Sequence, residues 1–141
     1  HTKIDNLLPL KNLLDLNELV CSGTQLSSLD GLQDLVKLEV LDCSETAIVD
    51  LVYLNKLTNL KQLNCKLTKV EDLNGVKNAT QLEDLFLTKT AIVSLQPIMS
   101  LQNLKNLDLF FCAISPTEIA EFKTKHPKCN VMALPMMGGI Y

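Results

Sequence analysis

Tryptophan is absent from this sequence, and aromatic residues fill only 4% of its 141 positions although 47% are hydrophobic. The chain is long enough for one domain with a substantial core, and that core must consist mainly of leucine, isoleucine and valine. No apolar run approaches the roughly 18 residues of a membrane-spanning helix, so we expect no membrane span. No signal peptide is visible, but the chain begins with His1 rather than methionine, so this absence does not indicate a compartment.

An excess of basic residues is also missing. The 13 lysine and arginine residues are outnumbered by 16 acidic ones, which gives a formal net charge of −3. A protein that binds the phosphate backbone of nucleic acids would carry a basic excess on one face, so we expect no nucleic-acid partner. The five cysteines are an odd number, which fits reduced thiols better than a disulfide framework and favours a reducing compartment such as the cytoplasm.

The sequence repeats itself every 22 residues. Leucine fills the first and fourth positions of each unit, in the two rows Leu16, Leu38, Leu60, Leu82, Leu104 and Leu19, Leu41, Leu63, Leu85, Leu107. The sixth position holds cysteine or leucine, the ninth holds threonine four times and then Cys112, and aliphatic residues recur at later positions. Five registers without a gap indicate a solenoid, in which each unit is covered by its neighbours.

The spacing within one unit predicts its shape. The fourth and sixth positions, such as Leu41 and Cys43, alternate as in a short strand with both side chains pointing inward. From Ile48 onward the apolar residues recur every three positions, which suits extended chain or 3₁₀ turns. Stacked units would therefore align their strands in a parallel sheet. On the other side of the stack, short helical turns are expected to begin around Pro9, Gly31, Gly75 and Pro97.

The unit L-x-x-L-x-(C/L)-x-x-T-x-(L/I/V) resembles the leucine-rich repeat over almost the whole chain, and its 22-residue length is similar to the bacterial, internalin-like class. The resemblance implies an α/β fold: a right-handed leucine-rich-repeat solenoid with a parallel concave sheet, a 3₁₀ or extended convex side and a C-terminal closing helix. It also implies protein binding, since repeats of this family serve mainly as interaction surfaces. Threonine replaces the family's usual asparagine at the ninth position. A hydroxyl offers fewer hydrogen bonds than an amide, so we expect the same turn held less completely.

Both ends of the repeat array depart from the period. Residues 1–15 match the second half of a unit; full units occupy 16–37, 38–59, 60–81 and 82–103; the last unit and a closing unit occupy 104–131; an apolar tail follows at 132–141. We expect a single domain over 1–141. Because no polar cap precedes the first unit, we expect this domain to be a fragment of a longer protein. The tail would cover the last coil or contact a partner.

The closing unit is predicted to contain a helix. The stretch SPTE at 115–118 is typical of a capping box with proline at the first helical position, and the pattern continues to about Lys125, before the His-Pro pair at 126–127. Ile119 and Phe122 would face the core. A last strand-like segment is expected around Cys129 and Val131.

No group of residues in the sequence indicates catalysis, a cofactor or a metal ion. Cys21, Cys43 and Cys65 form a row of inward strand positions; zinc ligands must converge tetrahedrally, so we interpret this row as core packing. His126 and Cys129 have no companion ligands, and no histidine is placed to activate a serine or threonine. We therefore expect no enzyme activity, no cofactor and no metal site.

Charged residues at the second position of each unit predict a structural feature. Their signs alternate from unit to unit, over Glu39, Lys61, Glu83 and Lys105. Residues on adjacent strands with opposite charge attract, so we interpret this row as a stabilising ladder of ion pairs rather than a ligand site.

Large apolar residues occur among the outward-facing strand positions. By register, Phe86 and Phe110 would be diagonal neighbours, and Leu67 and Phe111 would follow the same rim. Exposed aromatic residues bordered by carboxylates are typical of a protein-binding patch. A structural alternative is that Leu67 and Phe111 fold under the turn, or that Phe110 packs on the closing helix. The candidate partner-binding residues are Val40, Asp42, Leu67, Asp84, Phe86, Asp108, Phe110 and Phe111.

The predicted function is a protein–protein interaction module that binds a macromolecular partner on the concave face. Two alternatives stay open. One is a regulatory or targeting domain of a larger protein. The other is a structural repeat protein that self-associates through the exposed edge strand at 16–21. The family resemblance also allows a secreted or cell-surface location, so the compartment stays open.

Overall fold

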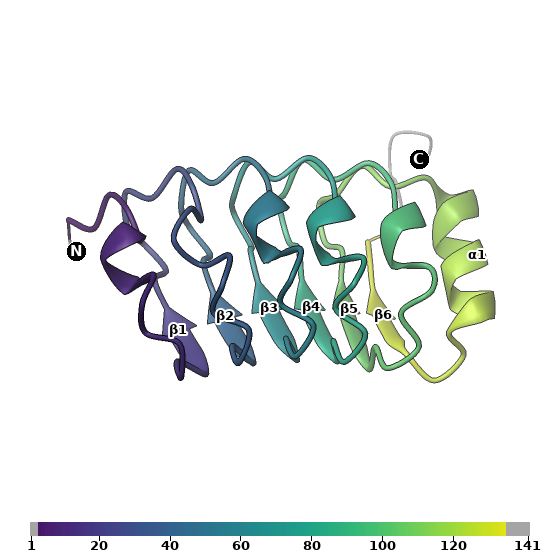
Figure 1. The fold of residues 1–141 in the computed structure, drawn as a ribbon. Coiled ribbons are helices and arrows are strands. Elements are labelled where there is room, and N and C mark those ends of the chain that lie inside the picture. Colours follow the sequence, from purple (N-terminus) through teal and green to yellow (C-terminus); the bar gives the residue numbers. More distant parts are fainter. Residues whose placement is uncertain (1–2, 135–141) are drawn as a thin grey trace.

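Parallel strands form one side of a stack of coils. The computed structural model describes residues 3–134, and within that range the strands make one six-stranded sheet in chain order. In Figure 1 the strands line one side of the stack, the 3₁₀ turns lie on the other, and helix α1 (Pro116–Lys125) closes the C-terminal end. The strands are β1 (Glu18–Val20), β2 (Val40–Asp42), β3 (Gln62–Asn64), β4 (Asp84–Phe86), β5 (Asn106–Asp108) and β6 (Asn130–Met132). The 3₁₀ turns are η1 (Leu8–Leu10), η2 (Val52–Leu54), η3 (Asn74–Val76) and η4 (Gln96–Ile98).

The strand register confirms the 22-residue period. Leu19 pairs with Leu41, and Leu41 with Leu63, so equivalent residues of successive units lie side by side. The inward fourth-position leucines of β2 to β5 are fully buried, whereas their neighbours in β2, β3 and β4 are half-buried. The leucine-rich-repeat solenoid predicted from the sequence is therefore confirmed as the fold. Most of the apolar tail, residues 135–141, lies outside the described residues.

The cysteine row is part of the core, as predicted. Cys21, Cys43 and Cys65 are buried among the leucines, and all five cysteines carry free thiols. Burial raises the pKa of the Cys21 thiol from near 9.0 to about 11, with a smaller contribution from the Asp42 carboxylate. Burial also raises the pKa of Cys43 well above 9.0, and the neighbouring thiols add to the effect. These thiols are therefore neutral packing groups rather than thiolates.

Side-chain and backbone hydrogen bonds together hold the threonine turn. Each of the four ninth-position threonines donates its hydroxyl to the carbonyl three residues earlier, as the Thr46 Oγ1 does to the Cys43 carbonyl at 2.7 Å. The Thr90 Oγ1 also lies 3.4 Å from the Cys112 Sγ. Backbone bonds to neighbouring coils supply the remaining support. The N–H of Glu45 donates to the next coil and the N–H of Ala47 donates to the preceding coil. The turn therefore does not need an asparagine amide to bridge it.

A row of short polar side chains starts each convex turn, and the sequence analysis missed it. In each case a side-chain oxygen at the thirteenth position of the unit accepts a hydrogen bond from the N–H two residues later. The five residues are Asn6, Ser28, Asp50, Asp72 and Ser94. Asparagine, aspartate and serine favour this local turn, so their recurrence at one fixed position was a readable signal.

Two glycines allow successive convex turns to approach closely. A Cβ on Gly75 would lie 2.0 Å from the Leu51 carbonyl oxygen, and one on Gly31 would lie 2.4 Å from that of Leu7. The predicted helical turns near Pro9, Gly75 and Pro97 are present as η1, η3 and η4. Around Gly31 the chain makes a turn with φ +114° but no 3₁₀ helix.

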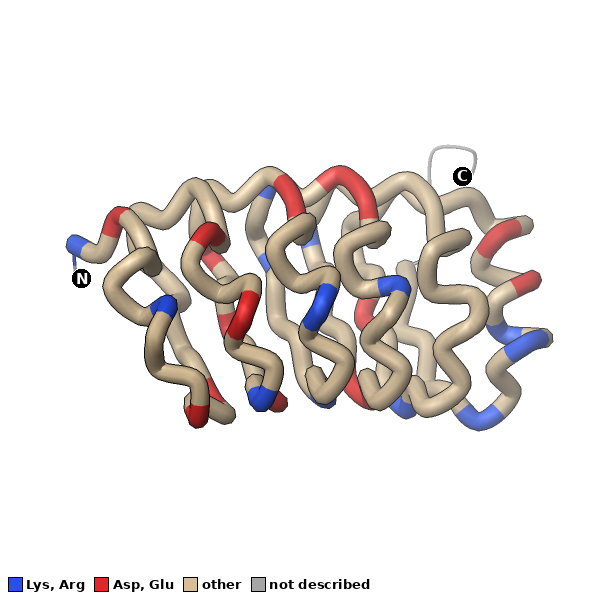
Figure 2. Tube along the Cα trace, viewed as in Figure 1, with Lys and Arg blue, Asp and Glu red and all other residues tan. Residues whose placement is uncertain are grey.

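The closing helix forms where predicted, but only half of the predicted capping box does. The Glu118 N–H donates to Ser115 Oγ at 3.2 Å. The Glu118 carboxylate turns instead to the preceding coil, where it accepts from Ser94 Oγ at 2.9 Å and from the Leu95 N–H. Phe122 is fully buried and its ring stacks on His126 at 3.9 Å between centroids. Figure 2 shows acidic residues toward the start of α1 and basic residues toward its end, which complements the helix dipole.

The predicted charge ladder is only partly correct. Lys61 pairs with Glu39 at 3.0 Å and Lys105 pairs with Glu83 at 3.2 Å. Among the ion pairs of residues 3–134, none links Lys61 to Glu83, so the row consists of two separate pairs. Both are exposed, and pairs of this kind contribute about 1 kcal/mol at most.

Candidate functional site on the concave face

The outward side of the sheet and one adjoining rim make up the candidate site. We call the outward-facing side chains of β1 to β5, together with the seventh- and eighth-position residues that follow each strand, the concave face. The eighth-position residues form its rim, and all five have a left-handed backbone with φ between 55° and 68°. They are Gly23, Glu45, Leu67, Lys89 and Phe111.

Two bulky apolar residues are held on this rim under backbone strain. Leu67 is 47% exposed with φ 56°, and Phe111 is 63% exposed with φ 61°. The structural alternative, in which they fold under the turn, is therefore wrong. A left-handed backbone costs a residue with a side chain roughly 1–2 kcal/mol, and glycine at either position would avoid this cost. Strained, exposed apolar side chains weaken the fold, and such residues are typical of functional surfaces.

A polar network surrounds Phe86 in the middle of the face. Lys66 reaches from the end of β3 across the neighbouring coil, with its Nζ 5.2 Å from the Phe86 ring centre and 3.5 Å from the Asp108 carboxylate. The same carboxylate accepts from Thr88 Oγ1 at 2.6 Å and from the Phe110 N–H at 3.1 Å. Residues from three successive coils thus hold the half-buried Phe86 and Phe110 in place.

The expectation that free carboxylates border the aromatic residues is wrong for Asp108. This residue is only 3% exposed, because Lys66 and Thr88 enclose its carboxylate. Asp84 is half-buried and accepts from Asn106 Nδ2 at 2.7 Å. Lysines border the rings instead: Lys89 Nζ lies 5.3 Å from the Phe111 ring centre. The sequence analysis did not select Lys66, Thr88 or Lys89, although their register beside the phenylalanines was visible.

The remaining candidates lie toward the N-terminal end of the face. Val40 and Asp42 are half-buried on β2, and the Asp42 carboxylate accepts from the backbone and hydroxyl of Ser44 at 3.0 and 2.6 Å. One strand, β3, lies between them and Phe86 on β4. The eight candidates therefore divide into a β2 pair and a cluster over β3 to β5.

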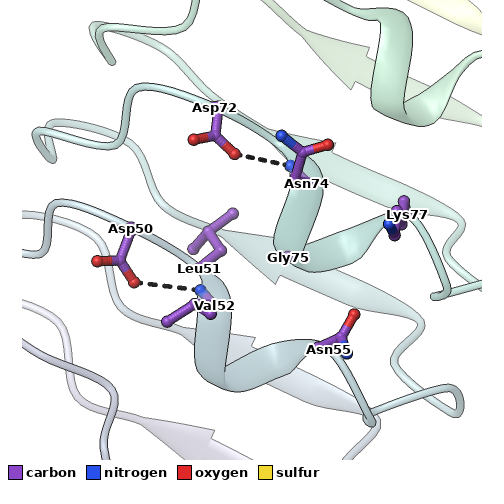
Figure 3. A pocket seen from close by; sticks show the side chains of 8 residues that line it. All are labelled: Asp50, Leu51, Val52, Asn55, Asp72, Asn74, Gly75 and Lys77. Atoms are coloured by element: carbon purple, nitrogen blue, oxygen red, sulfur yellow. Dashed lines mark hydrogen bonds between the residues drawn. The ribbon is translucent and has the colours of Figure 1, made fainter.

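Apart from the concave face, a hollow of about 390 Å³ lies between η2 and η3 on the convex side (Figure 3). Gly75 and Leu51 line it where the two turns are in close contact, since a Cβ on Gly75 would lie 2.0 Å from the Leu51 carbonyl oxygen. Figure 3 shows that the carboxylates of Asp50 and Asp72 start the two turns, where each accepts a backbone N–H at 3.1 and 2.9 Å. These groups already have a structural role, so the hollow is a by-product of turn packing.

Among the described residues 3–134, no group of three or more histidine, cysteine, aspartate or glutamate side chains is arranged to hold a metal ion. In the same part of the chain, no helix has the length and apolar character needed to cross a membrane.

Comparison with solved structures identifies the same architecture in other proteins, whereas no protein-family model and no curated protein matches the sequence. An internalin (InlF) of Listeria monocytogenes is 27% identical with a TM-score of 0.83 over 93% of this chain. The functional domain of InlJ from the same organism, which includes a cysteine ladder, is 24% identical with a TM-score of 0.76 over 94% of this chain. A plant peptide hormone receptor, RGFR1 in complex with RGF2, is 17% identical with a TM-score of 0.76 over 95%. This chain spans 38%, 27% and 23% of these three structures, respectively.

Proposed function

Because the chain is a leucine-rich-repeat solenoid with an internalin-like fold, we propose that it is a protein-interaction module whose concave face binds a protein partner. The observation that carries this proposal is the strained rim, where Leu67 and Phe111 hold large apolar surfaces in solvent beside Phe86. Large apolar and aromatic side chains that a partner can desolvate contribute most of the energy at protein interfaces. The plant receptor with the same fold is in complex with its hormone RGF2, which supports the same use of this architecture.

The face is built to bind without rearrangement. The hydrogen bonds of Asp108 join the coils of β4 and β5, and Lys66 adds the coil of β3. A face held in one shape loses little conformational entropy on association, so more of the contact energy appears as affinity.

The test is a capture experiment with three versions of the chain as bait: the parent, Leu67→Ala with Phe111→Ala, and Val52→Ala with Val93→Ala. The valines are the matched control, since they are 58% and 63% exposed and lie outside the strands and the rim. Cytoplasmic and surface fractions of the source cell are both used. We expect a protein that is retained by the parent and the valine variant and lost by the rim variant. Equal retention by all three baits would contradict binding at this face.

Self-association is a second candidate, and the N-terminal edge favours it. Within residues 3–134, strand β1 pairs only with β2, and Val20 on it is 60% exposed. An exposed strand edge can pair with another chain. In sedimentation equilibrium, a Val20→Lys variant would then be less associated than the parent. A parent chain that is monomeric across the concentration range would eliminate this candidate. A regulatory or targeting role within a larger protein is compatible with either mode of binding.

A further inference from the structure

The two ends of the concave face differ in charge. Around β1 and β2 the face carries Glu18, Asp42 and Glu45 and no basic residue. Among the ion pairs of residues 3–134, none involves any of these three carboxylates. Ser44 donates to Asp42 without neutralising it. This end of the face therefore presents three uncompensated negative charges to an approaching partner.

The other end is neutral and apolar. Over β3 to β5 the charges balance, because Lys66 pairs with the buried Asp108 and Lys89 offsets Asp84. The aromatic residues of the face are all at this end, namely Phe86, Phe110 and Phe111, together with Leu67, whereas the β1–β2 end carries only the smaller Val20 and Val40. Lys89 beside Phe111 repels any cation that a partner would place on this apolar cluster.

We propose, resting on the proposed function, that the partner offers an extended segment with lysine or arginine at one end and large apolar side chains at the other. The basic end lies over Asp42 and Glu45, and the apolar end over Phe86 and Phe111. Charge complementarity fixes this orientation, since reversing it would place a cation against Lys89 and an apolar group on unpaired carboxylates.

The sheet also sets the spacing within that segment. Three strand intervals separate β2 from β5, and at about 4.8 Å each they span roughly 14 Å. An extended chain advances about 3.3 Å per residue, so the basic residue and the apolar residue are about four positions apart. The pattern fixes the positions of two kinds of side chain and not the backbone, so either chain direction of the segment can satisfy it.

The experiment selects random 12-residue peptides, displayed on phage, against the immobilised chain. The selected peptides are then measured by fluorescence anisotropy against two charge variants. The first is Asp42→Asn with Glu45→Lys. Other units of the repeat already carry both new residues at these positions. Asn64 is the equivalent of Asp42 and accepts from the Lys66 N–H as Asp42 accepts from the Ser44 N–H. Lys89 is the equivalent of Glu45 and has the same left-handed backbone. The control, Asp34→Asn with Glu71→Lys, makes the same change in net charge at exposed residues outside the concave face.

We expect the selected peptides to share a basic residue about four positions from a large apolar one. Their affinity should fall about tenfold or more with the first variant, stay unchanged with the control, and weaken as salt increases. Peptides without the basic residue, or with equal affinity for both variants, would overturn the charge pattern. If the charge pattern failed in this way but Leu67→Ala with Phe111→Ala still abolished peptide binding, the proposed function would stand. If the rim variant also bound the peptides normally, the proposed function would fail together with the charge pattern. Selection of no peptide would overturn the extended segment and leave the capture experiment to decide on a folded partner.

Discussion

The two ends of the solenoid carry the same repeat but are covered differently. At the C-terminal end, α1 lies over the last coil and buries Phe122 completely. At the N-terminal end nothing within residues 3–134 lies beyond the first coil, and Leu13 is 49% exposed although Leu35 and Leu57, its equivalents 22 and 44 residues later, are buried. The contrast shows that the period decides which way a side chain points, whereas burial depends on whether another element follows.

The largest effect should come from opening the closed end. Phe122→Ala removes a fully buried ring that stacks on His126, and substitutions of this kind cost about 3–5 kcal/mol. Glu121→Ala, one residue earlier and exposed, should change the free energy of unfolding by about 0.5 kcal/mol or less. Urea unfolding followed by circular dichroism measures both. Similar losses for the two variants would mean that α1 does not act as a cover.

The second prediction compares one repeat position at the open end and in the interior. Leu57→Ala should cost about 2–5 kcal/mol, because Leu57 is buried between coils. Leu13→Ala, at the equivalent half-exposed position, should cost less than about 1 kcal/mol. The same urea experiment applies. If Leu13→Ala were as damaging as Leu57→Ala, some other part of the protein must cover the first coil in solution.

Local spacing was enough to predict most of the fold. The period of 22 determines the strand register, and the alternation of Leu41 and Cys43 determines the inward side, because both depend only on backbone geometry. The limits of the closing helix followed from Ser115, Pro116 and His126, whose effects act within a few residues.

The candidate site was less predictable because its side chains interact across several coils. The burial of Asp108 depends on Lys66 and Thr88, which lie 42 and 20 residues earlier, so no local pattern indicates it. The Glu118 carboxylate likewise accepts from Ser94 and Leu95 of the preceding coil rather than completing the capping box at Ser115. Strand register specified which residues are adjacent, but not which of several neighbours each long side chain contacts.

The third prediction uses two buried thiols of the cysteine row to extend the comparison of the two ends. Cys43 is deep in the stack and burial raises its pKa well above 9.0, and the pKa of Cys21, directly after β1 near the open end, rises to about 11. In the unfolded chain both thiols ionise near pH 9. The contribution of a raised folded-state pKa is therefore fully present below that pH and is lost as pH rises toward the folded pKa.

For Cys43 the expected loss is about 1.4 kcal/mol of unfolding free energy per pH unit above 9. The test is urea unfolding at several pH values between 8 and 10 for the parent and Cys43→Ala. The variant will differ in absolute stability, but its alkaline decline should be shallower. Parallel declines would show that Cys43 does not remain neutral in the folded chain.

The smallest predicted effect is local to the closed end. Ser115→Ala removes the oxygen that accepts the Glu118 N–H, and loss of such a cap costs about 1 kcal/mol. Ser115→Asp should retain most of the stability, because a carboxylate also caps and favours the positive end of the helix dipole. Hydrogen exchange should show faster exchange in α1 of the alanine variant while β2 and β3 stay protected, since each coil contacts only its neighbours. If protection fell equally throughout the sheet, the stack would unfold as one cooperative unit. The two ends would then differ in how exposed their side chains are, but not in local stability.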